Sequence, residues 1–246
     1  MSAIGTAAEG AIFPDMGGDD TTGTGTGTGT GHDGMNVSDL RRSATGFVLD
    51  REDLNENPIV QFEGWFRHAC ASVPMDPNAM SFATVDSDGR PSIRTVLLKY
   101  FDAKGFVFFT NYESKKAIDI DGNANVALLF FWSDAARQVK IRGKAERISA
   151  AETLKYFISR PRGSQIGAWV SAQSSVISSR ALLETKFQEV KQKFKKKEVP
   201  LPSFWGGYRV VPQQIEFWQG RRNRMHDRFQ YSRQDDGTWE IERLAP

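Results

Sequence analysis

The stretch Ser81 to Asn111, SFATVDSDGRPSIRTVLLKYFDAKGFVFFTN, decides the fold of this chain. Three runs within it are rich in β-branched and aromatic residues, which favour β-strands. The segments DSDG and DAKG lie between these runs, and Asp and Gly are typical of tight hairpin turns because glycine reaches positive φ angles. The sequence therefore predicts three successive strands, around Phe82 and Thr84, over Ile93–Tyr100 and over Phe106–Thr110.

The middle strand of the three carries two positive charges. Arg94 and Lys99 bracket the apolar segment TVLL, and cations on a core strand indicate a concave site for an anionic ligand beside the sheet. The two positions have opposite parity, so a regular strand would point them to opposite faces. Both can reach ligands only if the strand bulges or if two ligands lie on different sides of it.

Composition limits the class of protein. The 246 residues, 39% of them hydrophobic and 17 of them Phe, fit one large or two small domains with a substantial core. The sequence predicts neither a transmembrane helix nor a secretory signal, because it has no apolar run of about 18 residues and no basic start followed by an apolar block. A net charge of +2 does not argue for nucleic acid. We expect a soluble, cytoplasmic protein.

The chain has a single cysteine, Cys70. One cysteine excludes an internal disulfide framework and a metal site built from several cysteines. Cys70 falls on a predicted helix, and we expect a small buried residue there rather than a nucleophile.

The chain divides into a low-complexity tail and one domain. Residues 1–36 contain the repeat TTGTGTGTGTG, whose alternate glycines leave no packing surface to offset the loss of backbone entropy on folding, so we predict disorder. Residues 37–246 are predicted to form a single domain. A short helix near 37–43 either folds over a site or forms a solvated arm.

Helix and strand signals fill the predicted domain. Asn57-Pro58 begins a helix as N-cap and first-turn proline, and Ser149 to Glu152 forms a capping box. The longest helix, 180–197, ends in lysines that we interpret as a solvated helix end. Further strands are predicted over 126–132, buried on both faces, over 138–147, with alternating faces, and over 205–211, 214–220, 229–233 and 238–243. Roughly seven to nine strands with interspersed helices predict a barrel-like sheet of the α+β class.

Two groups of side chains indicate phosphate. Lys115 and Lys116 fall in the first turn of a predicted helix, where cations oppose the helix dipole unless an anion binds there. Tyr156, Arg160 and Ser164 follow one another closely, and a phenol, a guanidinium and a hydroxyl match a phosphomonoester. The alternatives are that the lysines are merely solvated, that Tyr156 packs, and that Arg160 caps its helix.

The usual catalytic signatures do not occur: no phosphate-binding nucleotide loop, no HExxH and no GxSxG. His226, flanked by Arg224, Asp227 and Arg228, is the best single cluster. The dispersed cations exceed what one phosphate requires. Two phosphorylated small ligands, a cofactor and a substrate, account for them.

Several motifs, taken in order along the chain, resemble one family. RTVLLKYFDAKGFVFFTN, RQVKIRGKAER, SRPRGSQIGAWVSAQSS, PLPSFWGGYRV, QIEFWQG and RMHDRF closely resemble pyridoxine (pyridoxamine) 5′-phosphate oxidases, over Asn57 to Pro246. The resemblance implies a mainly β, FMN-binding split β-barrel with surrounding helices, in a homodimer that holds each FMN at the subunit interface. It implies oxidation of pyridoxine or pyridoxamine 5′-phosphate to pyridoxal 5′-phosphate, with O₂ as electron acceptor and H₂O₂ as product. It implies no metal, nucleic-acid or membrane partner.

The same resemblance assigns roles to individual residues. Arg224 and His226 would hold the pyridine ring against the flavin, as the implied catalytic pair. Asp76 falls at a further position near the site. The substrate phosphate would lie among Lys99, Tyr156, Arg160 and Ser164. FMN would contact Arg94, Thr95, Val96, Leu97, Leu98, Lys99, Phe109, Thr110, Lys115, Lys116, Gln138, Gln173, Ser174, Trp218 and Arg228.

Two residues depart from the family pattern. Ala44 stands where a tyrosine that can cover the substrate is usual, which puts the closure of a lid in question. Lys115 stands where arginine is usual, which replaces a bidentate fork by a point charge and predicts a weaker grip on phosphate.

Two other classes of protein compete with the oxidase interpretation. One is a flavin barrel that acts on another substrate or as a reductase, and the residues suited to a phosphorylated pyridine argue against it. The other is a non-catalytic module that binds pyridoxal phosphate or single-stranded nucleic acid. The near-neutral charge argues against nucleic acid, which calls for a basic groove.

Overall fold

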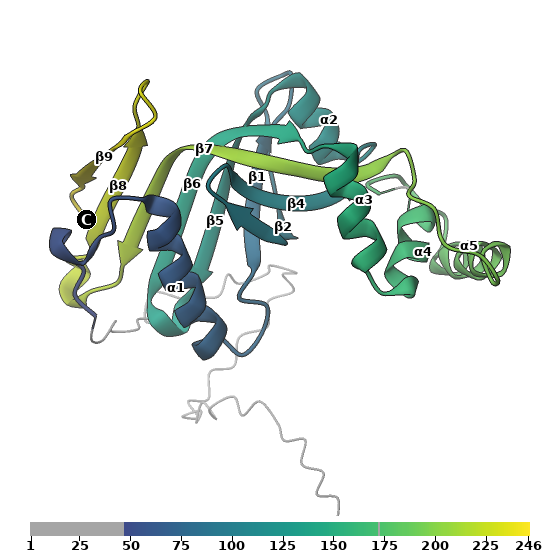
Figure 1. Ribbon diagram of the computed structural model, residues 1–246, viewed down its shortest axis with the longest axis horizontal. Helices are drawn as coiled ribbons and strands as arrows, with labels where there is room; N and C mark the ends of the chain where they lie inside the picture. The colour runs from purple at the N-terminus through teal and green to yellow at the C-terminus, as the bar shows by residue number, and fades with distance from the viewer. Residues whose placement is uncertain (1–46, 172) are drawn as a thin grey trace, which may run out of the picture. The chain divides into compact units, whose positions relative to one another are not determined.

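One nine-stranded antiparallel sheet forms the frame of the structure, a computed structural model that describes residues 47–171 and 173–246 (Figure 1). The strand order is β2-β1-β5-β6-β7-β4-β3, and β8 pairs with both β7 and β9. The sheet and its helices confirm the predicted α+β class. The strands are β1 (Ala79–Val85), β2 (Pro91–Leu97), β3 (Tyr100–Asp102), β4 (Gly105–Asn111), β5 (Asn125–Trp132), β6 (Arg137–Arg147), β7 (Trp205–Gln219), β8 (Asp227–Arg233) and β9 (Trp239–Arg243). The helices are α1 (Pro58–Ser72), α2 (Lys115–Gly122), α3 (Ala150–Ser159), α4 (Arg162–Val170) and α5 (Arg180–Lys193), with 3-10 turns η1 (Arg51–Asp53), η2 (Ser133–Ala135) and η3 (Arg222–Arg224).

Some predictions concern residues that the structure does not describe. The tail over 1–36, the short helix near 37–43 and Ala44 all lie outside the described residues. The boundary between tail and domain therefore stays a prediction.

The stretch 81–111 folds as predicted at its turns but not in its middle strand. Gly89 and Gly105 have the positive φ angles, 80° and 137°, that the two turns require. The predicted strand 93–100 is broken, because β2 ends at Leu97 and β3 begins at Tyr100. Lys99 lies at this break, so the alternation that governs side chains along a regular strand does not set its direction relative to Arg94.

Strand β5 is buried on one face only, contrary to the prediction for 126–132. Burial alternates along it, and Phe131 is 61% exposed. The reason is that α1 packs on one face, through contacts of Phe62 with Phe130 and Trp132. A continuous run of apolar residues, such as that of β5, can therefore belong to a strand that the described residues cover on one face only.

The two strands predicted over 205–211 and 214–220 are a single strand, β7. Pro212 lies inside it, opposite a shift of register between Arg142 and Gly143 of β6. Sheets accommodate proline at such irregularities, because the ladder hydrogen bond is already lost there.

Helix α1 begins as predicted but places its cysteine differently. The Asn57 side chain accepts a hydrogen bond from the N–H of Ile59 at 2.9 Å, and Pro58 occupies the first turn. Ala69 is buried in the core, whereas Cys70, the next residue round the helix, is exposed. The prediction of a buried cysteine is therefore wrong.

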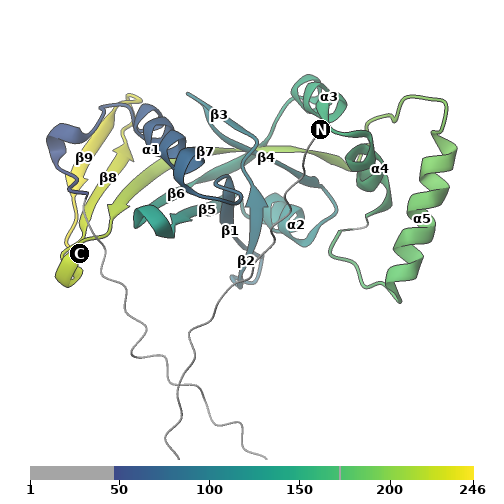
Figure 2. The ribbon, with the colours of Figure 1, turned by 90° about the horizontal axis from the view of Figure 1, so that it is seen from below.

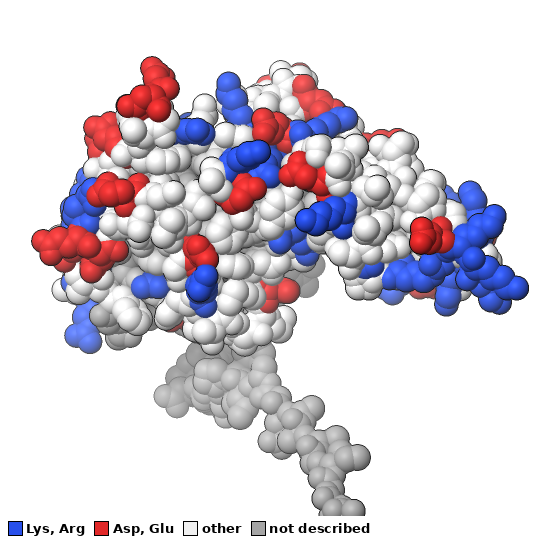
Figure 3. All heavy atoms as spheres, viewed as in Figure 1, with Lys and Arg blue, Asp and Glu red and all other residues white. Residues whose placement is uncertain are grey.

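Strand β7 connects two ends of the sheet. Helices α3, α4 and α5 gather beyond its start, and β8 and β9 lie at its other end (Figures 1 and 2). A second hydrophobic cluster at the helical end contains Phe157, Phe194 and Trp205. Lys and Arg side chains gather around α5 (Figure 3), and Lys191 and Lys193 are exposed, as predicted for a solvated helix end. Within the described residues, no helix is long and apolar enough to cross a membrane.

Candidate functional site

A cavity of about 810 Å³ lies between β2, the start of α2 and the helical end of the sheet. Most of the side chains that the sequence predicts as binding residues line it. A smaller cavity of about 330 Å³ shares seven of these residues and adds Trp205. Leu98 is the exception within the segment 94–99, because it is buried in the main core. The predicted residues that line the larger cavity are Arg94, Thr95, Val96, Leu97, Lys99, Phe109, Thr110, Lys115, Lys116, Tyr156, Arg160, Ser164, Gln173 and Ser174.

Lys116 forms a buried cationic centre at one side of this cavity. The residue is 7% exposed, and its Nζ donates to Gln173 Oε1 at 3.0 Å and to Thr110 Oγ1 at 3.1 Å. Burial, together with the smaller effect of the positive charge of Arg94, lowers the pKa of Lys116 to about 8. Neutral oxygens alone compensate a buried ammonium poorly, so the site favours an added anion.

The side chain of Arg94, which also lines this cavity, is fixed by neighbouring polar residues. Its guanidinium donates to Thr84 Oγ1 at 2.8 Å and to Ser92 Oγ at 2.6 Å, and lies 3.9 Å from the carboxylate of Asp119. Burial lowers the pKa of Arg94, while Asp119 partly restores it. These contacts fix the side chain without closing it off from the cavity that it lines.

Arg160 provides a second cationic centre, near the end of α3. The helix begins at the predicted capping box of Ser149 and ends at Arg160. The guanidinium lies over the ring of Trp205, 4.6 Å from its centre, and its buried Nη1 has no hydrogen-bond partner among the described residues. An unpartnered buried N–H of an arginine is costly, so this atom indicates a missing acceptor.

Lys99, Tyr156 and Ser164 accompany Arg160 in both cavities. Burial lowers the pKa of the Lys99 ammonium, and the charge of Arg160 lowers it again. Tyr156 stacks on Phe109 with ring centres 4.0 Å apart, as the packing alternative predicts, and still lines the cavity. The alternative in which the Arg160 side chain only caps its helix leaves Nη1 unexplained. Two nearby cations with a phenol and a hydroxyl suit a phosphate ester.

Four of the remaining predicted residues, Gln138, Trp218, His226 and Arg228, form a second cluster on and beside β6, β7 and β8. Gln138, Trp218 and Arg228 are cross-strand neighbours in adjacent strands. The ring of His226 lies 4.5 Å from that of Trp218. Arg228 donates to the buried carboxylate of Glu216 at 2.9 Å.

The loop that carries Arg224 and His226 is locally strained. Asn223 and Arg224 have φ angles of 56° and 59°, in the left-handed region that non-glycine residues rarely adopt. His226 Nδ1 accepts the backbone N–H of Arg221 at 3.1 Å. Neutral His226 therefore carries its proton on Nε2, the nitrogen that remains free to donate.

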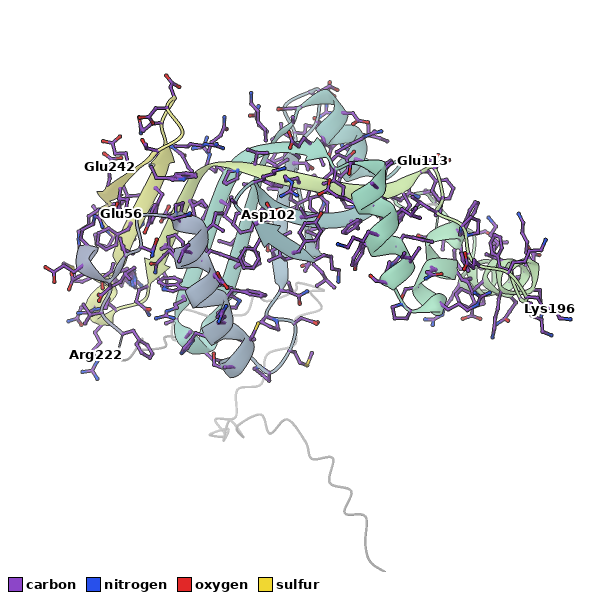
Figure 4. The ribbon with its side chains drawn as sticks, in the orientation of Figure 1. Glu56, Asp102, Glu113, Lys196, Arg222 and Glu242 are labelled. Atoms are coloured by element: carbon purple, nitrogen blue, oxygen red, sulfur yellow. The ribbon has the colours of Figure 1, made fainter. Side chains whose placement is uncertain are left out.

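A single chain does not bring the two clusters together. Trp205, at the start of β7, belongs to the first, and Trp218, near its end, belongs to the second. Thirteen residues at ~3.3 Å each correspond to about 40 Å of strand. Figure 4 shows Arg222, which belongs to the His226 loop, at the end of the described structure opposite to Lys196. None of Gln138, Trp218, Arg224, His226, Arg228 and Asp76 lines the larger cavity.

Sequence reasoning missed three residues around the first cluster. Thr84 accepts a hydrogen bond from Arg94 and donates one to Asp119, and Trp205 lies under Arg160. The spacing of Lys115 and Asp119, four residues apart on a predicted helix, was a usable signal for their ion pair. The links to Thr84 and Trp205 cross the fold and leave no local pattern.

The curled antiparallel sheet, with a cation-lined cavity at its edge, defines the class of split-barrel proteins. A family model described as pyridoxamine 5′-phosphate oxidase matches residues 66–194, and one described as the pyridoxine 5′-phosphate oxidase C-terminal dimerisation region matches residues 205–246. A protein of Rippkaea orientalis named pyridoxine/pyridoxamine 5′-phosphate oxidase is 63% identical over 212 residues, which cover 86% of this chain and 100% of that protein. The chain belongs to the pyridoxine/pyridoxamine 5′-phosphate oxidase family.

Solved structures support the same fold. PhzG from Burkholderia lata, in complex with tetrahydrophenazine-1-carboxylic acid, aligns with a TM-score of 0.78 at 26% identity, over 83% of this chain and 100% of that chain. A pyridoxamine 5′-phosphate oxidase-related, FMN-binding protein from Nostoc punctiforme aligns with a TM-score of 0.63 at 17% identity, over 77% of this chain and 97% of that one. The predicted split β-barrel is confirmed.

Proposed function

We propose that this chain is an FMN-dependent oxidase that converts pyridoxine 5′-phosphate or pyridoxamine 5′-phosphate to pyridoxal 5′-phosphate, with O₂ as acceptor and H₂O₂ as product. Family membership supports the reaction. The observation that carries the proposal is the unpartnered Nη1 of Arg160, buried beside Lys99 in a cavity that also contains the buried Lys116. The single cysteine suits a reducing compartment and supports a cytoplasmic location.

The residues around Lys116 fit the phosphate of FMN. Arg94 and Lys116 would supply its charge-assisted hydrogen bonds, and Thr110 and Gln173, now bonded to Lys116, would add neutral partners. A phosphate would replace the incomplete compensation of the buried ammonium. When bound, FMN supplies the electron acceptor for the oxidation.

The residues around Arg160 fit the phosphate of the substrate. Its guanidinium fork and the Lys99 ammonium would bind the ester oxygens, with the hydroxyls of Tyr156 and Ser164 as neutral donors. Holding the phosphate fixes one end of the substrate, so the remaining binding residues need only orient the ring. Arg224 and His226 are proposed for that role, with Nε2 of His226 as the donor toward the substrate.

A second copy of the chain is proposed to complete the site. Trp218, Arg228, Arg224 and His226 lie in the region that matches the dimerisation model, and they are far from the cavity of their own chain. On the face shared by β2, β1 and β5, the apolar side chains of Ile93 and Phe131 are 70% and 61% exposed within the described residues. An exposed apolar patch of this kind is typical of a protein interface. We therefore propose a homodimer in which each cavity faces the second cluster of the partner.

Oxygen consumption tests the proposed function. Protein reconstituted with FMN should consume O₂ with pyridoxine 5′-phosphate and release H₂O₂, and should respond far less to pyridoxine, which lacks the phosphate that Arg160 would bind. Protein that binds no FMN, or that oxidises both compounds equally well, contradicts the proposal.

A further inference from the structure

Asp119 is a buried carboxylate directly behind the cations of the cavity. Its side chain is 1% exposed, and it does not line the cavity itself. Thr84 Oγ1 donates to Oδ2 of Asp119 at 2.7 Å, and Lys115 Nζ pairs with Oδ1. Arg94 Nη2 lies 3.9 Å from the same carboxylate. A buried negative charge in this position acts directly on Lys115 and Arg94, two of the cations that line the cavity.

Lys115 is already engaged by carboxylates. Besides Asp119 it contacts Asp86 Oδ2 at 3.4 Å, and its side chain is half exposed. These two contacts raise the pKa of Lys115, the hydrogen bond to Asp119 being the larger cause. The lysine ammonium is a compact point charge, whereas an arginine guanidinium has five N–H donors in a fork. Once carboxylates occupy one side of the ammonium, fewer of its donors remain for a ligand than an arginine would retain.

Arg94 differs from Lys115 because it does not depend on Asp119 for its position. Its guanidinium has three other partners, the carbonyl of Phe82, Thr84 Oγ1 and Ser92 Oγ. Thr84 donates to Asp119, and an asparagine oxygen can accept the same bond. The geometry of Arg94 is therefore expected to survive a change of Asp119 to asparagine, while the charge behind it disappears.

We propose that Asp119 is an internal counter-ion of the cofactor-phosphate site, which engages Lys115 and limits how strongly Arg94 binds the phosphate. This inference rests on the proposed FMN site. In the absence of phosphate, Asp119 offsets the repulsion within the cation cluster. Once phosphate is present, the same carboxylate repels it, so Asp119 lowers the affinity for the phosphate group and not for the flavin ring.

The test compares FMN with riboflavin, which lacks the phosphate. Asp119→Asn should bind FMN about tenfold more tightly than the wild-type protein, because it removes a buried negative charge that repels the bound phosphate. Riboflavin affinity should not change. The matched control is Asp121→Asn on the same helix, where the carboxylate is 52% exposed and pairs with Arg147, and it should change neither affinity. Titration of the full chain with each flavin, followed by flavin fluorescence, measures the FMN and riboflavin affinities of the wild-type protein and of both variants.

A second variant, Lys115→Met, tests the inference independently of the Asp119→Asn variant alone. Lys115→Met should weaken FMN binding at least fivefold more in the Asp119→Asn background than in the wild-type background, because only the released lysine reaches the phosphate. Equal losses in the two backgrounds overturn the inference. So does FMN affinity that is unchanged or weaker in Asp119→Asn, and so does an equal change for riboflavin. Failure of the FMN site is a different result, in which wild-type protein binds neither flavin.

Discussion

At the scale of single residues, Lys116 is expected to make the proposed FMN site sensitive to pH. Its pKa of about 8 in the folded protein lies below the value of 10.5 for an unperturbed lysine. Between these two pH values the unfolded chain therefore binds more protons at Lys116 than the folded protein does. The lowered pKa of Lys116 reduces the free energy of unfolding fully below pH 8, and this destabilisation disappears as the pH rises from 8 to 10.5. Phosphate binding has the opposite requirement, because it needs the protonated ammonium.

FMN affinity should consequently fall as the pH rises through about 8, by at most about tenfold per pH unit for one proton. Flavin fluorescence titrations from about pH 7 to about pH 9.5 measure this effect. Lys116→Arg is the matched variant, and its affinity should stay nearly constant over the range because arginine remains protonated. A flat profile for the wild-type protein contradicts the assignment of Lys116 to the phosphate.

Arg160 is expected to contribute through its fork and not only through its charge. Arg160→Lys should raise the KM for pyridoxine 5′-phosphate by about tenfold or more, because a lysine cannot bind two phosphate oxygens in parallel. FMN affinity should be unaffected. Arg162→Lys is the control, since Arg162 donates to the carbonyls of Phe194 and Lys197 and lies outside the cavities. A variant with unchanged KM and lost FMN would reverse our division of the two phosphate sites.

At the scale of elements, the long pair β6–β7 depends on a close approach at Gly143. A Cβ atom at this position would lie 2.1 Å from the carbonyl oxygen of Val211, on the opposing backbone. Gly143→Ala should therefore lower the free energy of unfolding by about 2 kcal/mol or more.

Gly64→Ala provides the comparison for that prediction. A Cβ atom at Gly64, inside α1, would meet nothing within 4 Å, so this change should stabilise the protein by about 0.5–1 kcal/mol. Urea unfolding of the two variants measures both effects. If Gly143→Ala and the wild-type protein had equal free energies of unfolding, β6 and β7 would be able to move apart at this position without loss of stability, which contradicts the prediction.

Local signals in the sequence predicted the elements well, and contacts across the fold explain the errors. Turns at Gly89 and Gly105 and the capping box at Ser149 depend on neighbouring residues, so they are legible in the sequence. The exposure of Phe131 depends on which face α1 covers. The continuity of β7 through Pro212 depends on the partner strand.

The candidate site divides in the same way. Tyr156, Arg160 and Ser164 are close in sequence, and the structure brings them together with Lys99 as the trio and the resemblance predicted. The hydrogen bond from Thr84 to Asp119 could not be predicted, because the two residues are 35 positions apart in the chain. Arg224 and His226 lie outside the cavity of their own chain, which no pattern within one sequence could reveal.

At the scale of the whole molecule, the proposed homodimer predicts complementation between defective chains. Arg160→Ala damages the first cluster and His226→Ala the second, and each variant alone should lose most activity while still binding FMN. Mixed in equal amounts and refolded or co-expressed, they should recover about one quarter of wild-type activity, because half of the dimers are mixed and each contains one intact site. No recovery would mean that each site belongs to one chain.

The central claim is that substrate held through its phosphate delivers its electrons to FMN on this chain. The most direct measurement is the absorbance of the FMN-loaded protein after addition of pyridoxine 5′-phosphate without oxygen. The flavin band should bleach with formation of pyridoxal 5′-phosphate, should return when O₂ is admitted, and should bleach far more slowly in Arg160→Ala at the same substrate concentration. A flavin band that persists in the wild-type protein, whatever the substrate concentration, contradicts the account.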